Sequence, residues 1–187
     1  MILDGLLAFS NITGGGTNPG DSPTAVASTP STNQLDLHLA TGSGIPVLAS
    51  GQGARDIGIG DDPAMKLLVL VTAAFTTGTG GTLSVSLQGS PDNGSGAPLG
   101  FVTYYTSPVY AVASLVIGAR LLDMDVPRPP AGVAEPRFLQ LAYNIATGIM
   151  TAGTLKAFIV LDRHDMFYNA LVNSTIGGYL PGVTVAN

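Results

Sequence analysis

The stretch that decides the fold is KLLVLVTAAFTTGTGGTLSVSLQ, residues 66–88. Its first seven residues, 66–72, are rich in Leu and Val and predict a buried strand. The Thr and Gly residues at 77–81 predict a turn. Residues 82–88 then alternate strictly, with Leu83, Val85 and Leu87 on one face. Two strands joined by a glycine-rich turn predict a domain built from β-structure.

Strand patterns recur on both sides of this stretch, whereas no window has the 3.6-residue apolar spacing of an amphipathic helix. The further predicted strands are residues 33–39, 101–105, 109–116, 137–145 and 153–162. The last two are expected to form a hairpin that reverses near Gly148 and Gly153. The proline-rich segment 123–136 is expected to run extended along a surface.

Composition agrees with an all-β domain. The chain has 187 residues, enough for one domain with a real core, and 45% of them are hydrophobic, which excludes disorder of the whole chain. Only 10% are charged, against about 25% in an ordinary soluble domain. The 25 glycines and 13 prolines favour short strands joined by turns. We therefore expect a β-sandwich of jelly-roll type.

Charge and hydropathy argue against several partners. The net charge is −5, and seven basic residues scattered singly form no stripe that could follow a nucleic-acid backbone. The longest apolar run, Leu67 to Phe75, is too short to span a bilayer. The first residues lack the basic start of a signal peptide, so we expect synthesis in a cytoplasm. The absence of cysteine removes disulfides and thiolate chemistry.

The chain divides into three predicted parts: an arm with a Gly/Pro-rich loop at 1–32, the sandwich at 33–162, and a tail at 163–187. Both terminal segments are apolar. The residues that we expect to be buried against a neighbouring chain are Ile2, Leu3, Leu6, Leu7, Phe9, Met166, Phe167 and Tyr168. Apolar arms outside a sandwich predict an interface, because in a monomer their apolar side chains would be exposed to water.

No catalytic pattern is complete, and the only histidines are His38 and His164. The segment Asp162-Arg163-His164-Asp165 could be a metal or hydrolytic site, but a hydrated strand end with local ion pairs is the favoured interpretation, since a metal needs about three convergent ligands. The acidic pairs Asp61-Asp62 and Asp123/Asp125 lack the spacing of a calcium loop. We expect no catalytic, cofactor-binding or metal-binding residue.

Three tyrosines could instead stack on a sugar ring. Tyr104 and Tyr105 are adjacent, so in a regular strand they would point to opposite faces, and only one of them could join Tyr110 on a platform. Packing in a core or an interface is the favoured interpretation.

The order of several short segments resembles the jelly-roll cement (decoration) proteins of tailed-bacteriophage capsids. These segments are residues 1–10, 54–60, 71–75, 81–88, 126–128, 137–143 and 151–162. The Gly/Pro/Ser-rich expansion at 14–53 and the tail after Asp162 depart from that pattern.

The resemblance implies a non-enzymatic virion protein on the outer surface of the capsid, which bridges subunits of a major capsid protein of HK97-like fold. A homodimer on capsid two-fold axes is the favoured oligomer, with a trimer as the alternative. A carbohydrate-binding jelly-roll module for host attachment is the rival function.

Overall fold

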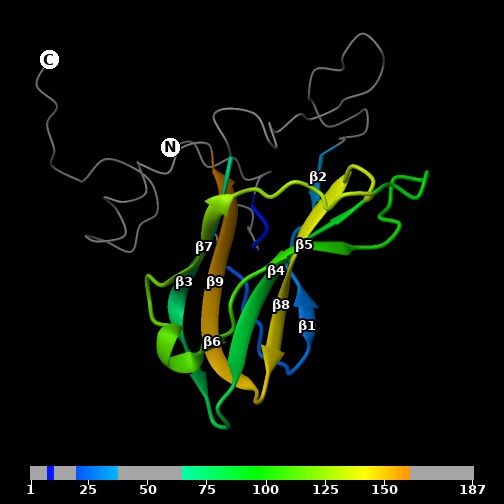
Figure 1. Ribbon diagram of the computed structural model, residues 1–187. Coiled ribbons are helices and arrows are strands. Elements are labelled where there is room, and N and C mark those ends of the chain that lie inside the picture. The colour runs from blue at the N-terminus through cyan, green and yellow to red at the C-terminus, as the bar shows by residue number, and fades with distance from the viewer. Residues whose placement is uncertain (1–7, 11–19, 38–64, 161–187) are drawn as a thin grey trace, which may run out of the picture.

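The computed structural model describes residues 8–10, 20–37 and 65–160, which form two packed antiparallel sheets (Figure 1). The elements are β1 (Ser28–Pro30), β2 (Leu35–Asp36), β3 (Lys66–Thr77), β4 (Thr82–Ser90), β5 (Val102–Thr106), β6 (Tyr110–Ala111), the 3₁₀ turn η2 (Val112–Ser114), β7 (Arg120–Asp125), β8 (Phe138–Ala146) and β9 (Met150–Val160). The predicted β-sandwich is confirmed.

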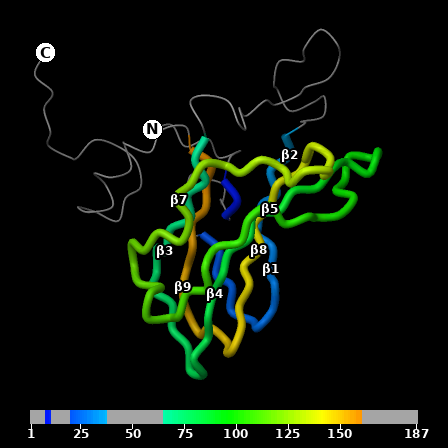
Figure 2. The backbone as a smooth tube through the Cα atoms, in the orientation of Figure 1, coloured from blue at the N-terminus to red at the C-terminus, as the bar shows by residue number. Residues whose placement is uncertain are grey.

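One sheet has six strands in the order β1-β8-β4-β5, with β2 also paired to β8 and β6 also paired to β4. The other has the order β7-β3-β9. The path of the backbone in Figure 2 shows the chain passing repeatedly from one layer to the other, as in a jelly roll.

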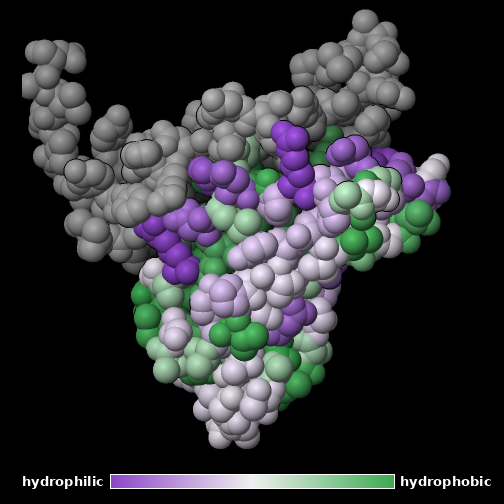
Figure 3. All heavy atoms as spheres, in the orientation of Figure 1, coloured by the Kyte–Doolittle hydropathy of each residue, from purple (hydrophilic) through white to green (hydrophobic). Residues whose placement is uncertain are grey.

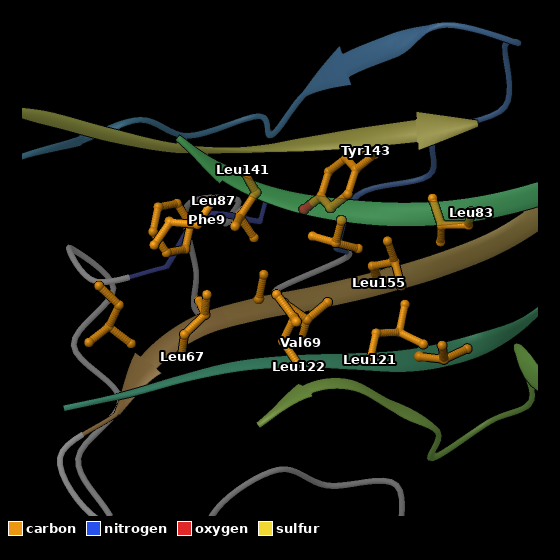
Figure 4. Packing of buried hydrophobic residues seen from close by; sticks show 14 of the residues in the cluster. Phe9, Leu67, Val69, Leu83, Leu87, Leu121, Leu122, Leu141, Tyr143 and Leu155 are labelled. Carbon is orange, nitrogen blue, oxygen red and sulfur yellow. The ribbon is translucent and has the colours of Figure 1, made fainter. Parts of the chain in front are cut away.

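The main core lies between the two sheets, and the strict alternation of β4 builds one wall of it. Leu83, Val85 and Leu87 are fully buried, and the β9 residue Leu155 faces them from the other sheet (Figure 4). Alternate residues that point inward from both sheets fill the space between the layers.

The two tight turns of the sandwich are arches between the sheets and not hairpins. The turn after β3 leads to β4 in the other sheet, and the turn after β8 leads to β9 in the opposite direction. The predicted hairpin of residues 137–145 with 153–162 is therefore wrong. Because β8 already lies between β1 and β4, both of its edges are occupied, and β9 pairs with β3 instead.

Two predicted strands are shorter than expected. The segment 109–116 contributes only β6, after which the chain turns through η2. The segment 33–39 contributes only β2 among the residues that the structure describes. Both are minor additions to the six-stranded sheet, β2 at one side of β8 and β6 at one side of β4.

The sandwich begins earlier in the chain than the predicted boundary at residue 33. Residues 28–30 pair with β8. Asp21 exchanges two backbone hydrogen bonds with Leu155 of β9, at 2.8 and 2.9 Å. The amide of Phe9 donates to the carbonyl of Ala157 at 3.0 Å, along the same edge of β9. Residues 8–10 and 20–30 therefore connect β9 of one sheet to β8 of the other. They close the side of the sandwich between these two strands.

Phe9 is consequently a core residue. Its side chain is fully buried between the sheets, beside Leu87 and Leu141 (Figure 4). The expectation that Phe9 packs on a neighbouring chain is wrong. Its aromatic ring fills the open side of the sandwich, where it buries a large apolar surface within its own core. The other seven predicted arm residues lie outside the described ranges.

Candidate interaction surfaces

The two ends of the sandwich differ in charge. At the end where β3 begins and β9 stops, which is the upper end in Figure 1, the described chain carries Lys66, Asp125, Arg137, Asp36 and Asp92. We call this the charged end. Lys66 pairs with Asp125 across neighbouring strands, and the other three residues form a single network.

Arg137 is the centre of that network. Its Nε and Nη2 donate to the two carboxylate oxygens of Asp36, each at 3.0 Å, and Nη1 donates to Asp92. The guanidinium also lies 4.9 Å from the ring centroid of Phe138. One side chain therefore fixes β2, β8 and the loop before β5 relative to one another, with the bidentate geometry that arginine provides.

Asp92 also organises its own loop. Its Oδ1 accepts hydrogen bonds from the amides of Gly94 and Gly96, both at 2.9 Å. Desolvation raises the pKa of this carboxyl, but the bonds from Arg137, Gly96 and Gly94 outweigh it, so the pKa of Asp92 is lowered from 3.8. The carboxylate form therefore stabilises the folded loop.

The residues that adjoin the N-terminal arm, the expansion at 38–64 and the C-terminal tail lie at the charged end. Val160 lies opposite Lys66, Leu37 donates its amide to Arg137, and Met65 directly precedes β3. Ala8 lies opposite Phe158, two residues from the end of β9. The N-terminal arm, the expansion at 38–64 and the C-terminal tail are thus all attached at this end.

An apolar cluster lies on the outer face of the three-stranded sheet, close to these attachment points. It comprises Ala8, Leu68, Leu70, Phe158 and Val160, each with less than one tenth of its surface exposed. The side chains of Leu68 and Leu70 point away from the main core, since Leu67, Val69 and Val71 occupy the inner face. Ala8 thus belongs to this outer cluster, whereas Phe9 belongs to the main core.

The opposite end of the sandwich has no charged side chain among the described residues. It is formed by residues 22–29, 71–84, 107–119 and 143–154, which include no Asp, Glu, Lys, Arg or His. We call it the uncharged end. On the face drawn in Figure 3, hydrophilic residues gather in the upper half of the molecule, and the lower end is pale or green.

Hydroxyl groups and close backbone contact hold the uncharged end together. Thr77 donates to the carbonyl of Ile149 at 2.7 Å and accepts from the amide of Gly81 at 3.0 Å, which links the two arches. A Cβ atom added at Gly81 would lie 2.5 Å from the carbonyl oxygen of Gly148. The arches are therefore in direct contact, and only glycine fits there.

Exposed apolar side chains concentrate at the uncharged end. Of the seven large apolar residues that are exposed in the described chain, five lie there: Val26, Val109, Val116, Ile117 and Ile149. The other two, Leu99 and Val102, lie in and just after the loop held by Asp92. Three of the five come from one uncharged connection, residues 107–119, between β5 and β7.

Val116 and Ile117 occupy the outward part of a tight turn. The amide of Ala119 donates to the carbonyl of Val116 at 3.0 Å, and Gly118 has φ +84°, the value that a type II turn requires at its third residue. The amide of Gly118 donates to Val71 of β3 at 2.8 Å, so the turn is anchored to the sheet. The side chain of Ile117, which lies on this anchored turn, is 69% exposed.

A buried polar cluster separates the two ends. The carboxylate of Asp21 accepts a bond from the hydroxyl of Tyr143 at 2.8 Å, and from the hydroxyl and amide of Thr32 at 2.5 and 3.2 Å. Burial, followed by the charge of Asp21 and its hydrogen bond, raises the pKa of Tyr143 well above 10. The tyrosine stays neutral and donates, which fixes the N-terminal segment to β8.

The three tyrosines that are candidates for sugar stacking are packed against the main core. Leu87 pairs with Tyr105 and Gln88 pairs with Thr103, so Tyr104 is the extra residue of a β-bulge, and both Tyr104 and Tyr105 contact the core. The prediction of opposite faces is wrong for this reason. The hydroxyl of Tyr110 donates to the carbonyl of Leu121 at 2.7 Å and closes the second side of the sandwich.

No group of three or more His, Asp and Glu side chains converges in the described part of the chain. Asp123 is paired with Arg120 at 3.2 Å, and Asp125 is paired with Lys66, so neither behaves as an open calcium ligand. His38, Asp61-Asp62 and the segment 162–165 lie outside the described ranges. Within those ranges the structure has no helix long and apolar enough to cross a membrane.

The sequence carries a signal for the uncharged end in the distribution of its charged residues. Residues 67–91 and 93–119 contain no charged side chain, a gap interrupted only by Asp92. Arg137 and Asp21 had no comparable signal, because their partners Asp36 and Tyr143 are more than 100 residues away in sequence.

A family model named Bbp16 matches residues 20–159, which include every strand except the last residue of β9. The chain belongs to the Bbp16 family. The match begins at Gly20, next to Asp21, and so supports the earlier start of the sandwich seen in the structure. No curated protein matches the chain.

Proposed function

We propose that this member of the Bbp16 family is a capsid cement protein. It binds the outer surface of a bacteriophage head and bridges neighbouring subunits of a major capsid protein of HK97-like fold. The observation that carries the proposal is the attachment of both terminal arms at one end of the sandwich, next to Ala8 and Val160. Two arms that leave from one end can reach the same underlying surface.

The energetics of the arms agree with this role. The N-terminal arm carries Ile2, Leu3, Leu6 and Leu7 with Asp4 as its only charge. Burial of apolar surface contributes about 25 cal/mol per Å², so contact with a shell stabilises such a segment strongly. The Arg137 network keeps the end from which the arms leave rigid, and a rigid base reduces the entropy lost on binding.

The rival function, a carbohydrate-binding module, loses its main support in the structure. It required an exposed aromatic platform, whereas Tyr104, Tyr105 and Tyr110 all pack against the core. The family name, which is of a kind given to phage proteins, also favours a virion component.

Removal of residues 1–7 tests the proposal. Because Ala8 and Phe9 remain, the segment that closes the sandwich is retained, and we expect the melting temperature to stay nearly unchanged. Removal of residues 163–187 is the corresponding variant for the tail. Cosedimentation with emptied phage shells should show binding reduced by at least about tenfold, which is 1.4 kcal/mol, in each variant.

Full-length protein with Leu6→Asp and Leu7→Asp provides a control for chain length. It should lose shell binding as the truncated protein does. If the truncated and substituted proteins all sediment with shells as the wild type does, the arms are not the attachment and the proposal fails. Binding of the intact protein to a glycan array but not to shells would favour the rival function.

A further inference from the structure

The loop held by Asp92 projects beyond the two sheets at the charged end (Figures 1 and 2). It comprises residues 91–101, between β4 and β5. At its base Arg137 donates to Asp92. A Cβ atom added at Gly94 or Gly100 would meet no atom within 4 Å apart from its chain neighbours. These parts of the loop therefore stand clear of the sandwich.

Hydrogen bonds within the loop give it a fixed shape. The amide of Leu99 donates to the carbonyl of Pro91 at 3.0 Å, which joins the two ends of the loop. The side-chain oxygen of Asn93 accepts bonds from the amide and the hydroxyl of Ser95, at 2.8 and 2.6 Å. Together with the two backbone amides that donate to Asp92, these bonds order the loop before it meets a partner. A preordered loop loses less entropy on binding.

The ordered loop presents one large apolar side chain to solvent. Leu99 is 69% exposed, although its own amide is bonded within the loop. Residues 93–100 carry no charge, and the ion pair of Asp92 with Arg137 lies at the base. An apolar side chain on a rigid support with polar groups around it is typical of a binding hot spot. A single exposed leucine is ordinary on a protein surface, so the position of Leu99 has to supply the rest of the argument.

The position of the loop indicates its partner. Both terminal arms are attached at the end of the sandwich from which the loop projects. A surface that both arms contact therefore also faces the loop. Because residues 93–100 are uncharged, the part of that surface opposite Leu99 has to be apolar and neither acidic nor basic.

We propose that residues 91–101 are a second point of attachment to the shell, with Leu99 inserted into an apolar depression on the outer surface of a capsid subunit. This inference rests on the proposed function, since the arms define the surface that the charged end faces. Because the arms and the loop are parts of one chain, binding of either raises the effective concentration of the other. The fixed loop also sets the orientation of the sandwich on the shell.

The test compares two side chains that are equally exposed at opposite ends. Leu99 and Ile117 are both 69% exposed. Each is replaced by Asp in the full-length chain, and the dissociation constant for emptied phage shells is measured by cosedimentation. In Leu99→Asp it should rise at least about tenfold, because a carboxylate would be buried in an apolar contact without a partner. Ile117→Asp should bind shells as the wild type does.

Asn93→Ala tests the order of the loop. It keeps Leu99 but removes the two bonds from Ser95, so the dissociation constant for shells should rise about threefold. Circular dichroism and the melting temperature show whether each variant is folded. Equal binding by Asn93→Ala and the wild type would overturn the ordered loop as part of the contact.

The outcomes separate this inference from the proposed function. If removal of residues 1–7 weakens shell binding but Leu99→Asp does not, the loop is not a contact and attachment through the arms stands. If Leu99→Asp and Ile117→Asp lose binding equally, the effect is not specific to the charged end and the inference fails. A wild type that does not bind shells overturns both proposals. Sedimentation equilibrium without shells is a further check, because a change of oligomeric state in Leu99→Asp would make a second copy the partner of the loop and overturn the inference.

Discussion

The two ends of this sandwich are stabilised by different physical means, although the same strands run through both. At the charged end, Arg137 connects β8 to β2 and to the loop of Asp92 through charge-assisted hydrogen bonds. At the uncharged end, two arches meet by direct backbone contact between Gly81 and Gly148, and the hydroxyl of Thr77 links them. One end relies on charge and the other on close packing.

The two means of stabilisation correspond to the chain segments that are attached at each end. Long segments leave the sandwich at the charged end, and ion pairs with defined geometry hold their points of exit in place. At the uncharged end the two arches are short, and hydroxyls and close packing can fix them. This end therefore needs no charge for its own stability, and its surface is free to be apolar. The comparison leads to four predictions about stability.

The largest effect is expected where residues 8–10 join the core near the charged end. Phe9→Ala should lower the free energy of unfolding by about 3–5 kcal/mol, because it empties a fully buried site between the sheets. Leu99→Ala, at an exposed position, should change it by less than about 0.5 kcal/mol. Urea denaturation measures both. A small effect of Phe9→Ala would mean that residues 8–10 are only loosely attached to the sandwich.

A smaller effect is expected at the arches of the uncharged end. Gly81→Ala should cost about 2 kcal/mol, since the new Cβ would lie 2.5 Å from a backbone oxygen and the arches would have to move apart. Gly78→Ala in the same turn is the matched control, because no atom lies within 4 Å of its added Cβ. Thermal unfolding should separate the two variants. Equal melting temperatures would refute direct contact between the arches.

The smallest effect is expected from the ionic network. Arg137→Met should lower the free energy of unfolding by about 1–2 kcal/mol near neutral pH, since the side chain is only 15% exposed. Lys66→Met, which disrupts the pair with the 60% exposed Asp125, should cost less than about 0.5 kcal/mol.

The ionic contribution should also depend on pH. The folded-state pKa of Asp92 is lowered from 3.8, so its stabilising contribution is present above that pH and is lost as the pH falls through the folded value. Denaturation measured from about pH 5 to pH 2 should show a steeper loss of stability in the wild type than in Arg137→Met. Parallel curves would show that Arg137 does not perturb Asp92.

The sequence by itself determined the class of fold and most of the strands. The Leu/Val run at 66–72 and the alternation at 82–88 depend on residues that are neighbours in the chain, so their periodicity is visible without a structure. The lack of charge in 67–91 and 93–119 is also a property of the sequence. It marks the residues from which much of the uncharged end is built.

Only the tertiary structure decided how these strands are paired. A glycine turn between two strands can be a hairpin or an arch, and the choice depends on which edges are already occupied. β8 has β1 and β4 beside it, so β9 must cross to β3. The burial of Phe9, the bond between Asp21 and Tyr143, and the bulge at Tyr104 likewise depend on residues far apart in sequence. No local pattern encodes them, because the free energy of each contact exists only once both sheets have formed.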